Sequence, residues 1–380
     1  MRNIIFMGIA SFLTDVSSEM IFTLLPLFLR NVLGVSLPII GIIEGIADST
    51  ATLTRLWSGW FSDRIGRRKV LALSGYSLST ISKLFLYFAS SWLSVLLIRF
   101  FDRVGKGVRT PPRDALIADS SIERGKAFGF HRAMDTFGAV LGLLIAAIII
   151  WMLQRGDLFL HEETFRFIVL IGIIPAFLAC VIFFIFVRDV GGGRGEGFGL
   201  AIRSLSPRFK FFLVITGIFT LSNFSDAFII LRAQGLGVPL FGIMLLFVFL
   251  NIVYSLSSTP FGIISDRLGR KRVLFLSFIL FGLSYILLGI VQNPYLLVPI
   301  FLLYGLYYGA YEGVGRAFVA DLTSERERGT GYGIFHTVIG ILAFPASLIA
   351  GFLWQELGPH VPFIFSASLS FLSAFLLLFL

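Results

Sequence analysis

The stretch that decides the fold is GWFSDRIGRRKV at residues 59–70, which recurs as GIISDRLGRKRV at residues 262–273. Each copy lies between two long apolar runs. A repeat on this scale is typical of a chain built from two like halves. Membrane proteins of this kind bind a ligand between their halves and alternate between two arrangements, so the repeat by itself indicates transport.

The composition is that of a membrane protein. Hydrophobic residues make up 57% of the chain and charged residues 14%, and the mean hydropathy is +0.91, a balance that soluble domains do not have. The net charge of +9 comes from short basic clusters between apolar runs rather than from a tail or a stripe. Such clusters indicate membrane topology, and we expect no nucleic-acid partner. Cys180 is the one cysteine and cannot form an internal disulfide.

A helix needs about 20 residues to cross a bilayer, and the apolar runs predict twelve such spans. They are residues 4–30, 36–60, 69–89, 92–114, 127–152, 166–187, 210–233, 238–262, 272–292, 294–318, 331–354 and 360–380. Most Lys and Arg residues lie in one set of connecting loops, which places both termini in the cytoplasm of a prokaryotic-type inner membrane. We expect no cleavable signal peptide, because the first run carries Asp15 and Glu19.

The predicted fold class is therefore an all-α membrane protein with twelve transmembrane helices in two pseudo-symmetric six-helix bundles. The bundles are residues 1–187 and 210–380, and residues 188–209 form a cytoplasmic linker between them. The first part of the linker is rich in glycine and predicted to be flexible. The second part is mildly amphipathic and basic, so it either lies along the membrane surface or is an ordinary linker.

Ionisable side chains are expensive inside a bilayer, so they face a partner or a wet interior. Every third predicted span carries either no such residue or only Lys83, which we expect to reach the membrane surface. The fourth span instead presents a basic face about 120° wide at helical spacing. Its residues are Arg99, Asp102, Arg103, Lys106 and Arg109. Pro111 and Pro112 follow, and we expect the regular helix to break there.

The chain resembles the major facilitator superfamily over its whole length. Residues 59–70 are similar to the family's signature between helices 2 and 3, and residues 262–273 to its weaker copy between helices 8 and 9. Asp119, followed by Arg124, recurs as Asp321. The resemblance implies that helices 1, 4, 7 and 10 line a central cavity while helices 3, 6, 9 and 12 face lipid. The distribution of charge along the sequence agrees with this arrangement.

The repeated loop also predicts a conformational latch. The Asp63 carboxylate lies at a helix end, where it can contact the positive N-terminus of a helix in the other half. The resemblance implies that such contacts stabilise the outward-facing state. The predicted latch residues are Gly59, Asp63, Arg64, Gly66, Arg67, Asp119, Arg124, Asp266, Arg267 and Asp321. The alternative is that the arginines only set the topology, which we expect of Arg68 and Lys69.

Carboxylates on neighbouring spans are predicted to lie at depths similar to those of the basic face. They are Asp15, Glu19, Asp48 and Asp135. One interpretation is an internally paired ladder that holds the first half rigid, because a buried ion pair costs several kcal/mol when half broken. The other is that some pairs open to substrate, and that Asp15, Glu19 or Asp48 takes up a proton during transport.

The second half of the chain is more apolar and offers different candidates. They are Asp226, Tyr304, Tyr308, Tyr311 and Glu312. The three tyrosines share one helical face, and an aromatic, hydroxylated wall suits an amphipathic ligand. The alternative is that these tyrosines only pack between helices.

These features predict a secondary transporter that moves a small organic solute, anionic or amphipathic, by alternating access coupled to protons. A basic face attracts carboxylate and phosphate groups. Two alternatives stay open, a multidrug-type proton antiporter exporting hydrophobic compounds and a transport-inactive receptor or scaffold. Leu143 stands where the exporter pattern has a proline. We expect a monomer without enzyme activity, cofactor or metal, since no ATP-binding or metal-ligand motif occurs.

Overall fold

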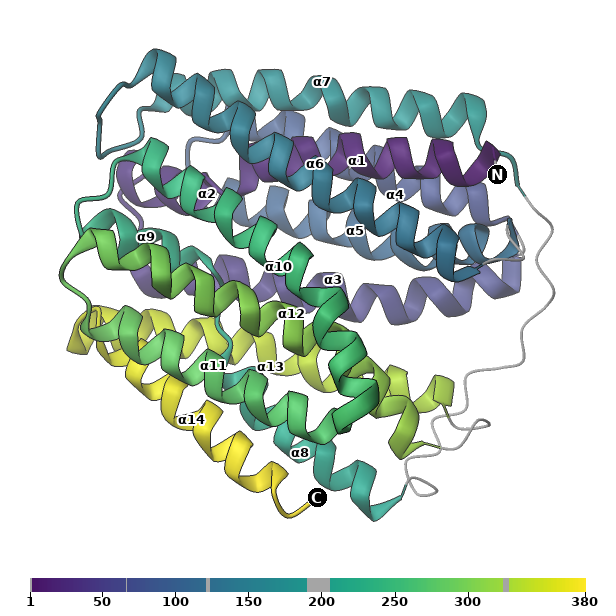
Figure 1. Ribbon diagram of the computed structural model, residues 1–380. Helices are drawn as coiled ribbons and strands as arrows, with labels where there is room; N and C mark the ends of the chain where they lie inside the picture. Colours follow the sequence, from purple (N-terminus) through teal and green to yellow (C-terminus); the bar gives the residue numbers. More distant parts are fainter. Residues whose placement is uncertain (1, 66, 121–123, 190–205, 324–327) are drawn as a thin grey trace. The chain divides into compact units, whose positions relative to one another are not determined.

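The computed structural model describes residues 2–65, 67–120, 124–189, 206–323 and 328–380, and its regular elements in these ranges are all helical (Figure 1). A chain in lipid must satisfy its backbone groups internally, which favours helices. The main helices are α1 (Arg2–Phe22), α3 (Leu37–Ile65), α4 (Arg68–Phe85), α5 (Trp92–Asp119), α6 (Arg124–Leu153), α7 (Glu162–Phe186), α8 (Pro207–Ser222), α9 (Ala227–Gly235), α10 (Leu240–Leu268), α11 (Arg270–Ile290), α12 (Leu297–Leu322), α13 (Arg328–Leu357) and α14 (Val361–Leu377). With α8 and α9 counted as one crossing, the twelve predicted crossings are confirmed within the described ranges.

Two of the crossings are broken. The first continues from α1 into α2 (Leu25–Leu27) and a π-helical turn, η1 (Phe28–Val32). The seventh is interrupted between α8 and α9, and Asp226 lies at the N-cap of α9. A helix break in a membrane exposes backbone groups that need other partners. The amide of Ser225 donates to the Ser347 hydroxyl at 3.1 Å, which satisfies one of them.

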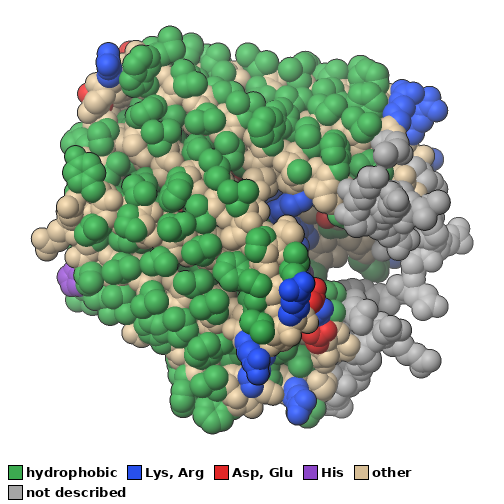
Figure 2. All heavy atoms as spheres, viewed as in Figure 1, with side chains coloured by type: hydrophobic (Ala, Val, Ile, Leu, Met, Phe, Trp, Pro, Cys, Tyr) green, Lys and Arg blue, Asp and Glu red, His purple; other side chains and the backbone are tan. Residues whose placement is uncertain are grey.

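Eight of the described helices are long and apolar enough to cross a membrane by length and composition. The charged helices α3, α4 and α5 are not among them, because their polar residues lower the mean hydropathy of the helix. Large hydrophobic side chains such as Phe184, Leu256 and Phe375 are exposed. Figure 2 shows that hydrophobic side chains cover most of the face in view, and that Lys and Arg are confined to a few places on it. A surface of this kind is suited to lipid.

The chain forms two compact units. The N-terminal unit comprises Met1–Val35, Ile46–Gly197 and Pro239–Met244, and the C-terminal unit comprises Ser36–Gly45, Phe198–Val238 and Leu245–Leu380. The linker predicted for residues 188–209 lies mostly outside the described residues. The division into residues 1–187, 188–209 and 210–380 therefore stays a prediction.

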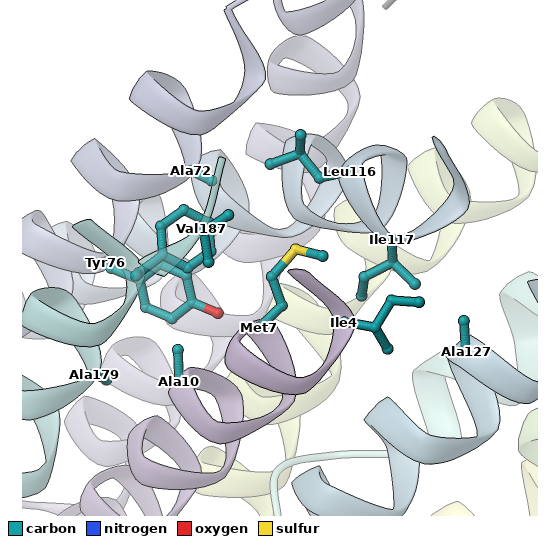
Figure 3. Packing of buried hydrophobic residues seen from close by; sticks show 11 residues of the cluster. Ile4, Met7, Ala10, Ala72, Tyr76, Leu116, Ile117, Ala127, Ala179 and Val187 are labelled. Atoms are coloured by element: carbon teal, nitrogen blue, oxygen red, sulfur yellow. The ribbon is translucent and has the colours of Figure 1, made fainter. Parts of the chain in front are cut away.

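The N-terminal unit is held together around α1. This helix packs against α6 and α7, while α4 packs against α5 and α7. Figure 3 shows the buried cluster in which Met7, Tyr76 and Ile117 come from different helices. Gly138 and Gly142 of α6 lie against the backbone of α1, where an added Cβ would meet a carbonyl oxygen. The close approach of these helices fixes the positions of the charged side chains on α1 and α5.

The C-terminal unit has an aromatic core. In this unit α11 packs against α12 and α14, and α8 packs against α13 and α14. The Phe219 ring lies 4.3 Å from Phe278 and 4.9 Å from Tyr311, measured between ring centroids. Offset and edge-to-face aromatic pairs stabilise a core beyond the area they bury. This core holds the face of α12 that carries the predicted tyrosines.

The predicted break at Pro111 and Pro112 is wrong, since α5 is helical through both prolines and ends at Asp119. Proline lacks the N–H that would bond the carbonyl four residues earlier, which for Pro112 belongs to Val108. The Ser58 hydroxyl of α3 donates to this carbonyl at 2.6 Å. A side chain on a neighbouring helix therefore satisfies the group that the proline frees, and the helix continues.

Candidate functional site

The centre of the basic face on α5 is Asp102. Its carboxylate lies 3.9 Å from a guanidinium nitrogen of Arg99 and 3.8 Å from that of Arg103, measured between N and O atoms. The Ser79 hydroxyl of α4 donates a hydrogen bond to the same carboxylate. Asp102 and Arg99 are 3% and 4% exposed. This part of the predicted face is therefore a buried, hydrogen-bonded ion cluster packed against α4.

Lys83 and Phe22, which were not among the predicted site residues, complete this cluster. Lys83 of α4 is fully buried and donates hydrogen bonds to the hydroxyls of Ser17 and Ser18 on α1 at 3.0 and 2.9 Å. The Phe22 ring lies under three cations, with the Arg99 guanidinium carbon 4.1 Å from the ring centroid. Arg103 and Lys83 lie 5.5 and 5.6 Å from it. The prediction that Lys83 reaches the membrane surface is wrong, because serines and an aromatic face solvate it inside the unit.

Lys106 and Arg109 continue the face one and two turns further along α5. The Arg109 guanidinium is buried over the Tyr76 ring, with its carbon 4.8 Å from the ring centroid. Among the described residues the Lys106 ammonium makes no hydrogen bond or ion pair. Asp15 of α1 is the carboxylate that interacts electrostatically with both cations. These charges face other helices of the unit, as expected, rather than lipid.

The acidic candidates on α1 and α6 differ in their partners. Glu19 accepts a hydrogen bond from the Thr23 hydroxyl at 3.1 Å. The Asp135 carboxylate lies 3.4 Å from Nδ1 of His131, a buried residue that the sequence did not single out. Asp15 is half-buried and makes no hydrogen bond or ion pair within the described part of the chain. Asp48 is half-buried on α3.

In the C-terminal unit the structure brings Asp226 and two of the predicted tyrosines together. The Asp226 carboxylate accepts hydrogen bonds from the hydroxyls of Tyr304 at 2.7 Å and Tyr308 at 3.3 Å. Tyr311 instead packs on Phe219 and Phe278. Glu312 accepts a hydrogen bond from the Tyr254 hydroxyl and lies 2.6 Å from a guanidinium nitrogen of Arg316. This site is acidic and aromatic where the site on α5 is basic.

Each copy of the repeated loop pairs an arginine with an aspartate further along the chain, although Arg270 aligns with Arg67 rather than with Arg68 in the repeat. Arg68 at the start of α4 pairs with Asp119 at the end of α5. Arg270 at the start of α11 lies 2.5 Å from Asp321 on α12 and 3.5 Å from Asp266, measured between N and O atoms. Arg67 and Asp119 were both predicted as latch residues, whereas Arg68 was expected only to set the topology. The structure instead joins Arg68 to Asp119, because residue 68 begins the helix while Arg67 is exposed before it.

The other predicted latch residues are placed as follows. Arg64 stacks over the Trp60 ring, with 5.5 Å between its guanidinium carbon and the ring centroid. Gly59 lies near Pro111, and Arg267 is exposed. Gly66 lies outside the described residues, as do the side chains of Asp63 and Arg124. Contacts of the latch across the two halves therefore stay a prediction.

A helical chain with a lipid-compatible surface, a duplicated loop and ionisable side chains inside each unit defines a multi-pass integral membrane protein of the transporter class. The model of the Major Facilitator Superfamily matches residues 7–231 and 209–380. An uncharacterized MFS-type transporter of Methanocaldococcus jannaschii is 37% identical over 391 residues, which cover 100% of this chain and 95% of the relative. The chain belongs to the major facilitator superfamily.

Solved structures give the same fold. A mutant of the nucleoside transporter NupG has a TM-score of 0.83 at 13% identity, covering 99% of this chain and 98% of its own. A POT family transporter in complex with 5-aminolevulinic acid has a TM-score of 0.79 at 14% identity, covering 100% of this chain and 96% of its own. At these identities the likeness shows the fold alone. The protein is thus an MFS transporter, and its substrate has to be argued from its own side chains.

Proposed function

We propose that this protein is a proton-coupled secondary transporter for a small organic solute that carries negative charge. The observation that carries the proposal is the row of four cationic side chains that α5 places inside the N-terminal unit. Arg99 and Arg109 are buried, and Arg103 and Lys106 are half-buried. Cations inside a membrane protein are costly unless they serve a ligand or a partner. An anionic group is the ligand that such a face attracts, and guanidinium groups bind carboxylate and phosphate oxygens in two-point fashion.

The proton-coupling residue in this proposal is Asp15. It interacts electrostatically with Glu19 on its own helix, with Lys106 and Arg109 on α5, and with Asp135 on α6. A carboxylate between like and opposite charges changes its proton affinity when a neighbouring charge is neutralised. An anion that neutralises the cations would change the proton affinity of Asp15. Binding of the anion is therefore coupled to binding of the proton.

We further propose that the protein lies in an inner membrane as a monomer, with both termini in the cytoplasm. The support is the clustering of basic residues at one set of helix ends, such as Arg68 at the start of α4 and Arg270 at the start of α11. Positively charged loops stay on the cytoplasmic side. Accessibility of engineered terminal cysteines to an impermeant reagent checks this orientation.

Reconstitution in proteoliposomes tests the proton coupling. The Asp15→Asn variant is expected to lose accumulation driven by a pH gradient while it keeps exchange of labelled against unlabelled solute. Glu163→Gln is the control, since Glu163 is an exposed carboxylate in the first turn of α7. If Asp15→Asn, Glu19→Gln and Asp48→Asn all still respond to the gradient, the proton-coupling proposal fails.

A multidrug-type exporter is the second candidate, and the site around Asp226 favours it. A carboxylate ringed by tyrosine hydroxyls and aromatic faces suits a hydrophobic cation. This candidate predicts protection from thermal unfolding by hydrophobic cations, abolished by Asp226→Asn, whereas the anion transporter predicts protection by organic anions. A transport-inactive receptor would show binding without solute flux in the same proteoliposomes.

A further inference from the structure

Three cations from two helices meet in the N-terminal unit, next to Arg103 of the Asp102 cluster. They are Arg55 of α3 and Lys106 and Arg109 of α5, and each interacts electrostatically with another of the three. Gly107 allows this meeting, because an added Cβ would lie 2.5 Å from the Thr54 Cβ and 3.0 Å from the Ala51 carbonyl oxygen. The backbones of α3 and α5 therefore touch beside Arg55 and Lys106.

Several N–H donors of these cations have no hydrogen-bond acceptor within the described ranges. The Nε atoms of Arg55 and Arg109 and the Nη1 atom of Arg109 are buried without a hydrogen-bond acceptor in the described ranges. In the same ranges Lys106 has no hydrogen bond or ion pair for its ammonium. Buried donors are nearly always satisfied in native structures, and an orphaned one points to an absent partner.

The counter-charges do not balance these cations. Asp15 is the carboxylate that interacts with Lys106 and Arg109. Asp114 interacts with Arg55, but its carboxylate already lies 2.8 Å from a guanidinium nitrogen of Arg113. Most of the charged groups that interact with Arg55 and Lys106 are themselves cations, among them Arg103, so positive charge is in excess at this site. Burying like charges without compensation is strongly unfavourable.

We propose that Arg55, Lys106 and Arg109 bind a doubly charged oxyanion of the transported solute, either a phosphate monoester or a pair of carboxylates. The proposal rests on the anion-transport function above and names its substrate class. Two arginine forks and a lysine point charge supply the donors that such a group accepts. A doubly charged group offsets the excess positive charge better than a singly charged one does.

Protonation of Asp15 connects the site to proton coupling. A neutral Asp15 leaves three positive charges for the anion to balance, so proton and anion binding strengthen each other. The other charged groups that interact with Asp15 are Glu19 on α1 and Asp135 on α6. Mutual strengthening predicts that the two ligands move in the same direction.

Thermal unfolding of the purified full chain in detergent tests the site, at equal ionic strength with inorganic phosphate, succinate or acetate. Phosphate or succinate is expected to raise the unfolding temperature, and acetate is not. Protection by phosphate alone assigns the phosphate monoesters, and protection by succinate alone assigns the dicarboxylates. The half-maximal concentration is expected to rise at least tenfold in Lys106→Gln and in Arg55→Gln. The control is Arg155→Gln, at an exposed arginine stacked on Trp151, and it is expected to bind as the unchanged protein does.

The proposal is overturned if neither phosphate nor succinate protects, if acetate protects as well as they do, or if both Lys106→Gln and Arg55→Gln bind unchanged. Each variant is first compared without ligand, so that a folding defect is recognised, and Arg109→Lys gives a third variant that keeps the charge. Gradient-driven accumulation of a monovalent anion without divalent protection refutes this site and leaves the transport function standing. Divalent protection without any flux supports the site and refutes the transport function.

Discussion

Helices α5 and α12 are counterparts in the two halves, and they differ in the polar side chains that they place inside each unit. Each ends with an aspartate paired to the arginine that begins the helix before it, Asp119 with Arg68 and Asp321 with Arg270. Counted back from these aspartates, the matched residues are Asp102 and Tyr304, Lys106 and Tyr308, and Arg109 and Tyr311. The first half places charges where the second places phenols. The same scaffold therefore supports a site held by ion pairs and a site held by neutral donors and aromatic packing.

The largest expected difference between the helices is in the loss of stability when the matched residues Asp102 and Tyr304 are substituted. Asp102→Ala leaves Arg99, Arg103 and Lys83 buried without their shared carboxylate, and it should destabilise the protein by about 3–5 kcal/mol. The matched change, Tyr304→Phe, removes one hydroxyl donor to Asp226 and should cost about 1–2 kcal/mol. Chemical unfolding in detergent measures both. Equal losses would mean that the carboxylate cluster is not the more strongly coupled site.

The second test concerns how closely α5 and α12 each pack against a neighbouring helix at a glycine. Gly107→Ala on α5 places a methyl group 2.5 Å from the Thr54 Cβ, which cannot rotate away, and overpacking of this kind costs about 1–3 kcal/mol. Its counterpart Gly309→Ala meets the Ser257 hydroxyl, which can change rotamer, so a smaller loss is expected.

Gly313→Ala is the control for both glycines, since no atom lies within 4 Å of an added Cβ there. Alanine has the higher helix propensity, so this variant should be up to about 1 kcal/mol more stable. The unfolding temperatures of Gly107→Ala, Gly309→Ala and Gly313→Ala compare the cost of an added methyl group at the three positions. A loss at Gly313 as large as that at Gly107 would show that helix packing is not what requires glycine on α5.

The smallest expected effect lies at the repeated ion pairs. The Arg68 side chain is 9% exposed and the Arg270 side chain 26%. Arg68→Ala should therefore destabilise the N-terminal unit by about 1 kcal/mol and Arg270→Ala by less, because solvent screens the second pair. Unfolding at low and high salt checks this order, and the salt sensitivity should be larger for the Arg270 pair. The opposite order would show that solvent exposure does not determine which of the two ion pairs stabilises the protein more.

The sequence predicted the helices better than the partners of their charges. Helical spacing was enough to place Arg99, Asp102 and Arg103 on one face of α5, because that spacing is local. Arg68 was expected only to set the topology and instead pairs with Asp119, since a shift of one residue at a helix start changes the direction of a side chain by about 100°. Lys83 was expected to reach the surface and is buried, since its fate depends on Ser17, Ser18 and Phe22 of another helix.

The sequence by itself determined that this protein spans a membrane, that it consists of two like halves, and that the first half carries the buried cations. Hydropathy, repetition and helical periodicity are properties of short stretches, and a bilayer leaves a helix as the main way to satisfy their backbone groups. Only the tertiary structure decided which charges pair, that α5 continues through its prolines, and which cations keep unused donors. Those outcomes depend on contacts between residues far apart in the chain, where a shift of one residue or one rotamer replaces one partner with another.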